Sequence, residues 1–349
     1  MPASLLPLFS PATLCVSPNA APLSAAPSHD VPLVDWLDLS TGINPHGYPV
    51  PHLNAACWQR LPAENDGLEA AAVAYYGNAR LLPLPGAQAA VRLLPALFPP
   101  ASIACLTPIY AGHPPAWARA GHKVRRLQAA SLAAALQRAL TAVTPVVLLC
   151  NPNSASAETL PRAVLLEAAA RLHRRGGWLI VDESFGDALP DNDLAPFAGS
   201  AEAPKLIVLR SLSQFFGLAG ARVGFILGAE EKLAPLREAL GPWPLCGPAR
   251  QAARYALSDR DWQEQTRQTL ASAVGRLAVL LQPFGETSAC ALFVTLKTPD
   301  ALALHEYLTR HAILTQCFDE PLLLRFGLPG HEAAWQRLSD ALNDWKQPC

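Results

Sequence analysis

A carboxylate follows directly after an apolar run near the middle of the chain. Asp182 comes after residues 178–181, Trp-Leu-Ile-Val, which predict a buried strand that ends at this carboxylate. A buried carboxylate is poorly solvated unless a cation or a hydrogen-bond donor accompanies it. We therefore expect Asp182 to face a ligand or a charged partner; the alternative is a carboxylate that caps a turn.

A second string, 211–224, has the composition of a phosphate-binding loop. It reads Ser-Leu-Ser-Gln-Phe-Phe-Gly-Leu-Ala-Gly-Ala-Arg-Val-Gly, and it combines the hydroxyls of Ser211 and Ser213, the guanidinium of Arg222 and three glycines. Glycines let the backbone approach an anion closely, and these polar groups donate hydrogen bonds to phosphate oxygens. The glycines around Arg222 argue against an ordinary surface cation.

Short apolar runs alternate with helix-like segments in the part of the chain that carries these residues. The predicted strands are 102–106, 146–150, 178–181, 206–209 and 223–227. The predicted helices are 88–97, 127–142 and 160–175. Short all-apolar strands between helices indicate a mostly parallel sheet that is covered on both faces. Such sheets bind ligands at the carboxyl ends of their strands, where Asp182 is predicted to lie.

The order of the predicted helices and strands changes toward the end of the chain. Helical patterns occupy 230–281, and the sequence then predicts a strand at 291–296, a helix at 302–310, short strands at 313–316 and 322–326, and a helix at 333–345. This order is typical of a smaller α+β unit. The sequence contains no internal repeat.

Five motifs, in order along the chain, resemble one enzyme family. They are Leu-Ser-Thr-Gly-Ile-Asn-Pro-His at 39–46, Thr-Pro-Ile-Tyr at 107–110, Val-Asp-Glu-Ser-Phe at 181–185, the string 211–224, and Leu-Arg-Phe-Gly-Leu-Pro-Gly at 324–330. The string resembles the lysine segment of fold-type-I enzymes that use pyridoxal 5′-phosphate (PLP). The full set, over roughly residues 35 to 345, resembles the threonine-phosphate decarboxylases of the cobalamin pathway, relatives of the histidinol-phosphate aminotransferases.

The resemblance implies the fold and the division of the chain. The expected architecture is α/β, with a large PLP-binding domain over residues 52–275 that contains a mostly parallel seven-stranded sheet. Residues 30–51 and 276–349 are expected to form a small α+β domain, and 1–29 a flexible Pro/Ala-rich tail. The resemblance also implies a homodimer with its sites at the subunit interface.

The resemblance implies roles for matching residues as well. Tyr110 would stack on the pyridine ring, Asp182 would pair with the ring nitrogen, and Arg325 would bind the substrate carboxylate. The implied cofactor-binding residues are Gly86, Ala87, Gln88, Tyr110, Ser154, Asp182, Ser211, Ser213 and Arg222. The implied substrate-binding residues are Asn44 and Arg325, and the catalytic positions are Gln214, Asp182 and Tyr110. Two alternatives stay open: Tyr110 could fill the core, and Arg325 could form an ion pair between domains.

Three features depart from the family pattern. Gln214 stands where the family has the lysine that binds PLP covalently, and an amide is neither a nucleophile nor a proton shuttle. Ser154 replaces the second asparagine of a Pro-Asn-Asn-Pro-Thr-Gly motif, and a His-Gly-Gly signature near the N-terminus is missing, with only His29-Asp30 near that place. We therefore hypothesise that the fold and the phosphate site persist while ordinary PLP catalysis is weak or absent, and we expect no covalent attachment of PLP.

Three functions follow from this comparison. The first is decarboxylation of L-threonine O-3-phosphate to (R)-1-aminopropan-2-ol O-2-phosphate and CO₂, impaired by Gln214. The second is amino transfer from a phosphorylated amino acid such as histidinol phosphate. The third is a non-catalytic binding protein on the same fold. In each case the expected partner is a small phosphorylated amino acid.

Composition excludes several other classes of protein. The 349 residues carry a formal net charge of −1, so the chain lacks the basic surplus of nucleic-acid or anionic-membrane binders. No apolar run approaches the length of a membrane span, and residues 1–28 carry none of the positive charge of a secretory signal. The 8 cysteines and the histidines lack metal-ligand spacing. We expect a cytoplasmic protein without a metal site.

Overall fold

The computed structural model describes residue 32 and residues 35–345; the predicted tail of residues 1–29 lies outside the described residues. Its largest feature is a seven-stranded sheet with the order β2-β8-β7-β6-β5-β3-β4. The strands are β2 (Leu81–Leu84), β3 (Ser102–Leu106), β4 (Lys123–Leu127), β5 (Val146–Cys150), β6 (Trp178–Asp182), β7 (Leu206–Ser211) and β8 (Gly224–Leu227). Only β8 runs antiparallel to its neighbours β2 and β7. The predicted mostly parallel seven-stranded sheet is confirmed.

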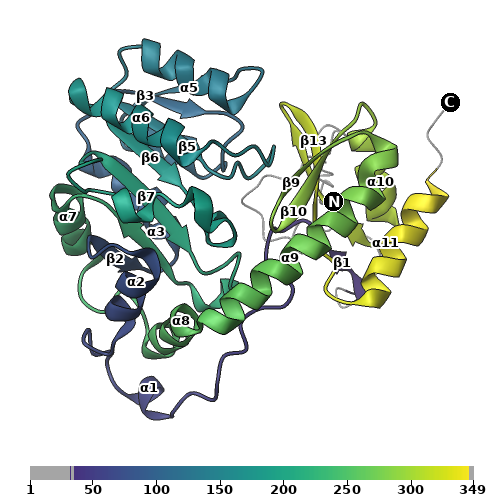
Figure 1. Ribbon diagram of the computed structural model, residues 1–349, viewed down its shortest axis with the longest axis horizontal. Coiled ribbons are helices and arrows are strands. Elements are labelled where there is room, and N and C mark those ends of the chain that lie inside the picture. Colours follow the sequence, from purple (N-terminus) through teal and green to yellow (C-terminus); the bar gives the residue numbers. More distant parts are fainter. Residues whose placement is uncertain (1–31, 33–34, 346–349) are drawn as a thin grey trace, which may run out of the picture.

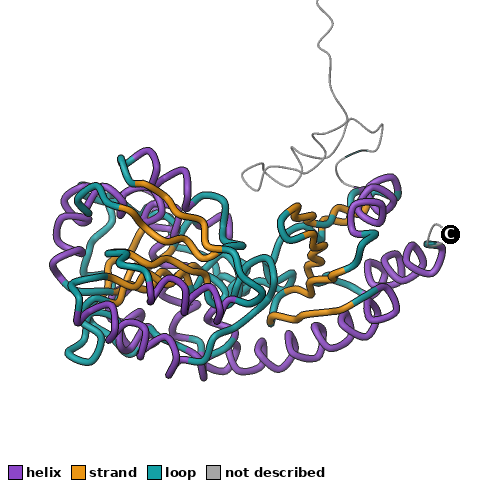
Figure 2. The backbone as a smooth tube through the Cα atoms, turned by 90° about the horizontal axis from the view of Figure 1, so that it is seen from above, coloured by secondary structure: helices purple, strands orange, loops and turns teal. Residues whose placement is uncertain are grey.

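Helices cover both faces of this sheet (Figures 1 and 2). They are α2 (Leu68–Tyr76), α3 (Ala87–Leu93), α4 (His113–Arg119), α5 (Leu132–Thr141), α6 (Arg162–Arg174), α7 (Glu230–Leu240) and α8 (Gly247–Ser258). The short helix α1 (Ala56–Gln59) buries no residue and lies away from the sheet, beside α8 (Figure 1). Alternate strand residues supply two separate cores: Val181 of β6 packs in one, with α5, α6 and α8, and Ile180 packs in the other, with α3, α4 and α7. This two-sided burial explains why the central strands read as continuous apolar runs.

The two edge strands are the elements that the sequence patterns did not predict. β4 reads Lys-Val-Arg-Arg-Leu and is mostly exposed, and β2 contains Pro83. A strand at the edge of a sheet tolerates charge and proline, so it lacks the apolar signature of a central strand. The helix predicted over 127–142 began too early: Leu127 closes β4, and α5 starts after Ser131, whose hydroxyl accepts from the backbone N–H of Ala134.

A second, smaller assembly is formed by the chain after β8, together with β1 from before the large sheet. A four-stranded antiparallel sheet has the order β12-β13-β10-β9, and β1 pairs in parallel with β11. The strands are β1 (Leu37–Asp38), β9 (Glu286–Cys290), β10 (Phe293–Lys297), β11 (Ile313–Leu314), β12 (Gln316–Asp319) and β13 (Leu322–Gly327). The predicted strand 313–316 is therefore divided between two sheets. The polar strand β9 was not predicted.

One long helix joins the two assemblies. α9 (Arg260–Leu281) begins beside α8 and runs along the smaller sheet, which α10 (Ala301–Arg310) and α11 (Glu332–Asp344) also cover (Figure 1). At its start, the carboxylate of Asp259 accepts from the N–H of Trp262, whose ring stacks on Phe216 at 5.7 Å between centroids. The start of α9 is thus fixed to the segment that carries Gln214.

The remaining helical turns are short 3-10 helices at Leu94–Leu97, Gly186–Ala188, Pro190–Asn192, Ala195–Phe197, Ala219–Ala221 and Gln282–Phe284. The first of them completes the helix predicted over 88–97, because α3 changes to 3-10 geometry next to Pro95. None of the helices in the described part of the chain combines the length and the apolarity needed to cross a bilayer.

Candidate active site

Asp182 is the buried carboxylate at the end of the central strand β6. Its Oδ2 atom lies 2.8 Å from Nε2 of His113, and its Oδ1 atom accepts from the backbone N–H (3.0 Å) and the hydroxyl (2.6 Å) of Ser184. Burial alone would raise the pKa of Asp182, but the hydrogen bonds from His113 and Ser184 outweigh it and hold the pKa below its usual value. The carboxylate is therefore ionised at neutral pH.

His113 is a site residue that the sequence analysis did not identify. It is the first residue of α4, it is buried, and its ring lies edge-on to Tyr110 with 5.9 Å between centroids. The only signal in the sequence is its position three residues after Tyr110. A single histidine in a sequence does not show whether its ring will pair with a carboxylate or simply pack in the core.

Tyr110 lies close to Asp182 and is only partly buried, so it belongs to neither core. Its hydroxyl donates to Oε1 of Gln88 over 3.1 Å. A Cβ atom on Gly112 would lie 2.5 Å from the Tyr110 ring, so the ring can take this position only beside a glycine. The arrangement presents an aromatic face next to an ionised aspartate.

The predicted phosphate-binding residues meet where β8 passes the start of α3. Gly86 has a φ of +74°, and a Cβ atom there would lie 2.8 Å from Nη2 of Arg222. Gly224 pairs with Ser211 across β7 and β8. The hydroxyl of Ser211 accepts from the backbone N–H of Ser213 over 3.2 Å. Guanidinium, hydroxyl and backbone donors thus surround one turn, which fits a phosphate group.

Gly224 keeps this turn open, and Gly224→Ala is expected to damage it. A Cβ atom at this position would lie 2.5 Å from the backbone nitrogen of Ala87 and 2.8 Å from the carbonyl oxygen of Arg210. Neither backbone atom can move like a side chain, so the variant should lose about 1–3 kcal/mol of unfolding free energy in urea titrations and bind a phosphate ligand more weakly. Gly220→Ala is the matched control, because a Cβ atom there meets nothing within 4 Å. Equal losses in both variants would contradict the prediction.

Gln214 and Asn44 are held together through the backbone. The N–H of Asn44 donates to the carbonyl oxygen of Gln214 over 2.8 Å, and the Asn44 amide donates to the carbonyl oxygen of Phe215 over 2.9 Å. Oδ1 of Asn44 accepts from the N–H of His46 over 2.9 Å. Oε1 of Gln214 is buried and has no hydrogen-bond partner in the described structure. Asn44 therefore fixes the segment that carries an unsatisfied amide oxygen.

Arg325 and Ser154 meet at the edge between the two sheets. Nη1 of Arg325 donates to the carbonyl oxygen of Ser154 over 2.6 Å, and Nη2 donates to that of Ser40 over 2.7 Å. Burial lowers the pKa of Arg325 to about 10, so the side chain stays cationic at neutral pH. In the described part of the chain Arg325 forms no ion pair with an acidic residue, and its Nε atom has no hydrogen-bond partner. A half-buried cation of this kind fits an anionic ligand group.

One trio in the site has the residue types of a metal site. Ligand atoms of His113, Cys150 and Asp182 lie within 4.8 Å of one another. The Asp182 carboxylate is already bonded to His113, and burial raises the pKa of the Cys150 thiol well above its usual value. The trio supplies three ligand atoms, and two of them, on His113 and Asp182, already bond to each other. The trio fits a hydrogen-bonded aspartate better than a metal centre.

A buried charged cluster lies directly behind the site. Arg210 precedes Ser211, and its guanidinium contacts Glu183 (3.2 Å), Asp187 (3.3 Å) and Asp193; these four residues are called the Arg210 cluster below. Glu183 follows Asp182 directly, so the cluster ties the ends of β6 and β7 together. A Cβ atom on Gly186 would lie 2.4 Å from Nη1 of Arg210, so the cluster also needs this glycine. Sequence patterns did not identify it.

The Arg210 cluster predicts a pH-dependent stability. Burial, together with Asp193 and Asp187 and against the opposing effect of Arg210, raises the pKa of Glu183 to about 8. The folded state then holds a proton that the unfolded state loses above a pH of about 4.5, so this contribution to stability is present at low pH and is lost as pH rises toward 8.

Glu183→Gln mimics the protonated side chain and is the test of that contribution. Relative to the unaltered chain, it should gain up to about 1.4 kcal/mol of unfolding free energy per pH unit between about pH 5 and 8. Urea titrations across this range measure the difference. Glu286→Gln, at an exposed glutamate of β9, should show no such dependence. A difference that is flat with pH for Glu183→Gln would contradict the assignment.

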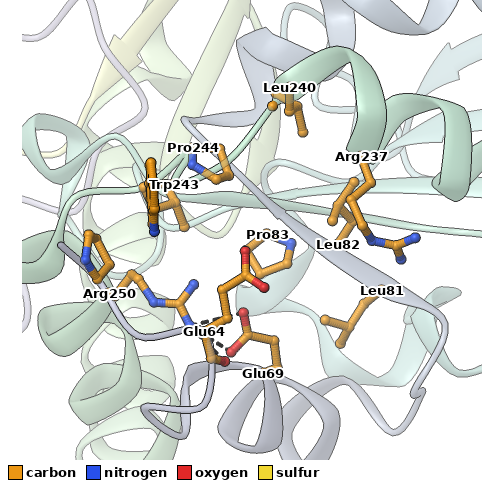
Figure 3. Close-up of a pocket in the computed structure, with 13 residues that line it drawn as sticks. Glu64, Glu69, Leu81, Leu82, Pro83, Arg237, Leu240, Trp243, Pro244 and Arg250 are labelled. Carbon is orange, nitrogen blue, oxygen red and sulfur yellow. Dashed lines mark hydrogen bonds and ion pairs between the residues drawn. The ribbon is translucent and has the colours of Figure 1, made fainter.

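A surface cavity of about 230 Å³ lies elsewhere, beside β2, α7 and α8 (Figure 3). Arg250 contributes to its wall and is already paired with Glu69 at 2.7 Å and with Asp66 at 2.8 Å. None of the predicted site residues lines this cavity. The polar residues at the strand ends, not this cavity, carry the candidate chemistry.

The mostly parallel sheet, the smaller antiparallel sheet and the ionised aspartate at the end of a central strand define the fold-type-I class of PLP-dependent enzymes. The comparison with protein families is more specific. The model for aminotransferase class I and II matches residues 59–341, and the chain belongs to this family, whose cofactor is PLP.

Within this family, the chain is most readily compared with individual proteins of known sequence or structure. The chain is 48% identical to the threonine-phosphate decarboxylase of Pseudomonas aeruginosa, over 93% of this chain and 96% of the relative. It is 39% identical to that of Sinorhizobium sp, over 88% and 92% of the two chains. The crystal structure of L-threonine-O-3-phosphate decarboxylase from Porphyromonas gingivalis superposes with a TM-score of 0.75 at 18% identity, covering 88% of this chain and 98% of that one. This last likeness concerns the fold.

Proposed function

We propose that this protein binds PLP and a small phosphorylated amino acid at the Asp182 site, as a threonine-phosphate decarboxylase whose catalysis is strongly slowed. The proposed reaction converts L-threonine O-3-phosphate to (R)-1-aminopropan-2-ol O-2-phosphate and CO₂. The observation that supports the proposal is the ionised Asp182 beside His113, together with Gly86 against Arg222, in a chain that has Gln214 at the position of the family's lysine.

The residues of the site support noncovalent binding of the cofactor. The ionised Asp182, held by His113, is suited to pair with a protonated ring nitrogen, and the exposed face of Tyr110 is suited to stack on the ring. Ser211, Ser213 and Arg222, with the N–H groups that follow Gly86, are proposed to bind the phosphate. When bound, PLP supplies an electron sink for the bond that breaks at Cα.

Arg325 is proposed to bind the substrate carboxylate. Its guanidinium lies between the carbonyl oxygens of Ser154 and Ser40 without a carboxylate partner, and a bidentate contact with a substrate carboxylate would supply one. Ser154 is proposed to donate to the cofactor, and Asn44 to position Gln214 from the substrate side. The proton that must be delivered to Cα after CO₂ leaves has no donor at position 214, since an amide does not act as an acid or base.

A non-catalytic binding protein is the second candidate, and Gln214 is the observation that favours it. Amino transfer, as in histidinol-phosphate aminotransferases, needs the same missing amine and is less well supported. The division into residues 52–275 and residues 30–51 with 276–349 stays a proposal; the separate seven-stranded and four-stranded sheets support it, although α9 crosses its boundary. A homodimer in the cytoplasm is also proposed, on the family resemblance alone.

Reconstitution with PLP tests this proposal. We expect binding without the absorbance band of a covalent lysine adduct, and no modified lysine in peptide maps after borohydride reduction. Released aminopropanol phosphate, quantified by mass spectrometry with PLP saturating, should be barely above the reaction without protein. A borohydride-trapped lysine would overturn the proposal of noncovalent binding. Turnover at the rate of the family's lysine-containing enzymes would overturn the proposal of slowed catalysis.

A further inference from the structure

The amide of Gln214 leaves an oxygen atom unsatisfied inside the protein. Oε1 of Gln214 is buried and accepts no hydrogen bond from the described residues. A buried acceptor without a donor costs free energy, because it has lost its hydrogen bonds to water and gained none in return. A bound group that donates a hydrogen bond to this oxygen would remove that cost.

The segment around Gln214 offers no easy way to relieve the cost by moving. The backbone carbonyl of Gln214 accepts from Asn44 (2.8 Å) and from Gly217 (3.2 Å), and the side chains of Phe215 and Phe216 are fully buried. A Cβ atom on Gly217 would lie 2.5 Å from Cα of Gly47, so the two chain segments are in close contact. The backbone that carries the Gln214 side chain is thus fixed, so the segment cannot shift to give Oε1 a partner.

The two common forms of the vitamin B6 phosphate differ in what they offer at the 4′ carbon. PLP carries an aldehyde, whose oxygen only accepts hydrogen bonds. Pyridoxamine 5′-phosphate carries a primary amine, which is protonated near neutral pH and donates up to three hydrogen bonds. Because Gln214 occupies the position of the family's lysine, we expect its amide to be the group nearest to this substituent.

We propose that Gln214 makes the site select the amine form, pyridoxamine 5′-phosphate, over the aldehyde form, PLP. This inference rests on the proposed cofactor site. A lysine at position 214 would favour binding of the aldehyde form for two reasons. It would bond to the aldehyde covalently, and its charge would repel the ammonium group of the amine form. The neutral amide removes both effects, and Oε1 accepts from the ammonium group instead. The chemical class of ligand is therefore a phosphorylated pyridine with an aminomethyl group.

Calorimetric titration of the full-length protein, stripped of ligands, tests the inference with three probes. Pyridoxamine 5′-phosphate should bind about tenfold more tightly than pyridoxine 5′-phosphate, which carries a neutral hydroxymethyl group in place of the ammonium group, since a charged donor adds roughly this factor over a neutral one. PLP should bind no more tightly than pyridoxine 5′-phosphate. Equal or tighter binding of PLP relative to the amine overturns the inference and leaves the proposed cofactor site intact. Failure of all three probes to bind overturns both.

Variants at position 214 test whether the amide of Gln214 causes the selectivity between the two ligands. Gln214→Leu, which keeps the apolar bulk, should bring the affinity for pyridoxamine 5′-phosphate within about twofold of that for pyridoxine 5′-phosphate. Gln214→Lys should reverse the order in favour of PLP. Gln251→Leu is the matched control, because Oε1 of Gln251 is also buried without a partner but lies on α8, outside the site. A selectivity that survives in Gln214→Leu would overturn the role assigned to Gln214.

Discussion

Gln214→Lys is expected to bind PLP covalently and to raise the rate of decarboxylation of L-threonine O-3-phosphate by about 10²–10⁴-fold over the unaltered chain, the usual contribution of a general acid or base. The physical reason is that a lysine amine can attack the aldehyde and can later return a proton to Cα, whereas an amide does neither. Absorbance spectra, borohydride trapping and the release of aminopropanol phosphate measure the three consequences.

Two controls make this result specific. Gln214→Met has a side chain of similar length without an amine, and it should stay at the level of the unaltered chain. Gln251→Lys introduces a lysine outside the site and should form no PLP adduct. If Gln214→Lys forms the adduct but remains inactive, the cause lies at other departures such as Ser154. If it forms no adduct at all, the proposed position of the cofactor is wrong.

Arg210→Met is expected to lower the free energy of unfolding by about 3–5 kcal/mol, the usual cost of removing one partner from a buried ion pair. The substitution leaves Glu183, Asp187 and Asp193 together without their shared guanidinium. They must then take up protons or expose themselves to water. Urea titration at pH 8 measures the loss, and titration at pH 5.5 should show a smaller one, because protonation of the acids relieves their repulsion.

Arg276→Met provides the comparison for an exposed ion pair. Arg276 contacts Glu332 at 2.6 Å, but both side chains are at least half exposed, so the change in stability should be much smaller than for Arg210→Met. The double variant E183Q/R210M should recover part of the stability lost in R210M. Similar losses at Arg210 and Arg276 would show that the Arg210 cluster does not have the importance assigned to it.

The central part of the fold could be predicted from the sequence because burial on both faces leaves an unmistakable apolar run. Strands β3, β5, β6, β7 and β8 were predicted within one or two residues of their ends. β2 and β4 were not, since edge strands accept proline and charge. The small strand β9 was missed for a related reason: most of its side chains face solvent and are polar.

The candidate site could be predicted from the sequence where a residue type, in its local pattern, has few roles other than ligand binding. A carboxylate at a strand end and a loop rich in glycine and hydroxyl groups both indicate ligand binding, whereas His113 and the Arg210 cluster give no such pattern. Their partners are separated along the chain by many residues, as with His113 and Asp182, which are 69 positions apart. Only the folded chain, with α4 and the turns after β6 packed against the strand ends, brings them together.

α9 is one unbroken helix that reaches from the large sheet to the smaller sheet, so its two ends move together. Its 22 residues correspond to a rod of about 33 Å, anchored at one end through Trp262 and Phe216. A tilt of about 5° at that anchor displaces the far end by about 3 Å, on the rise per residue of an ideal helix. A small change in the aromatic contacts that hold the start of α9 would therefore be felt at its far end, which packs beside β9 and β10 of the smaller sheet.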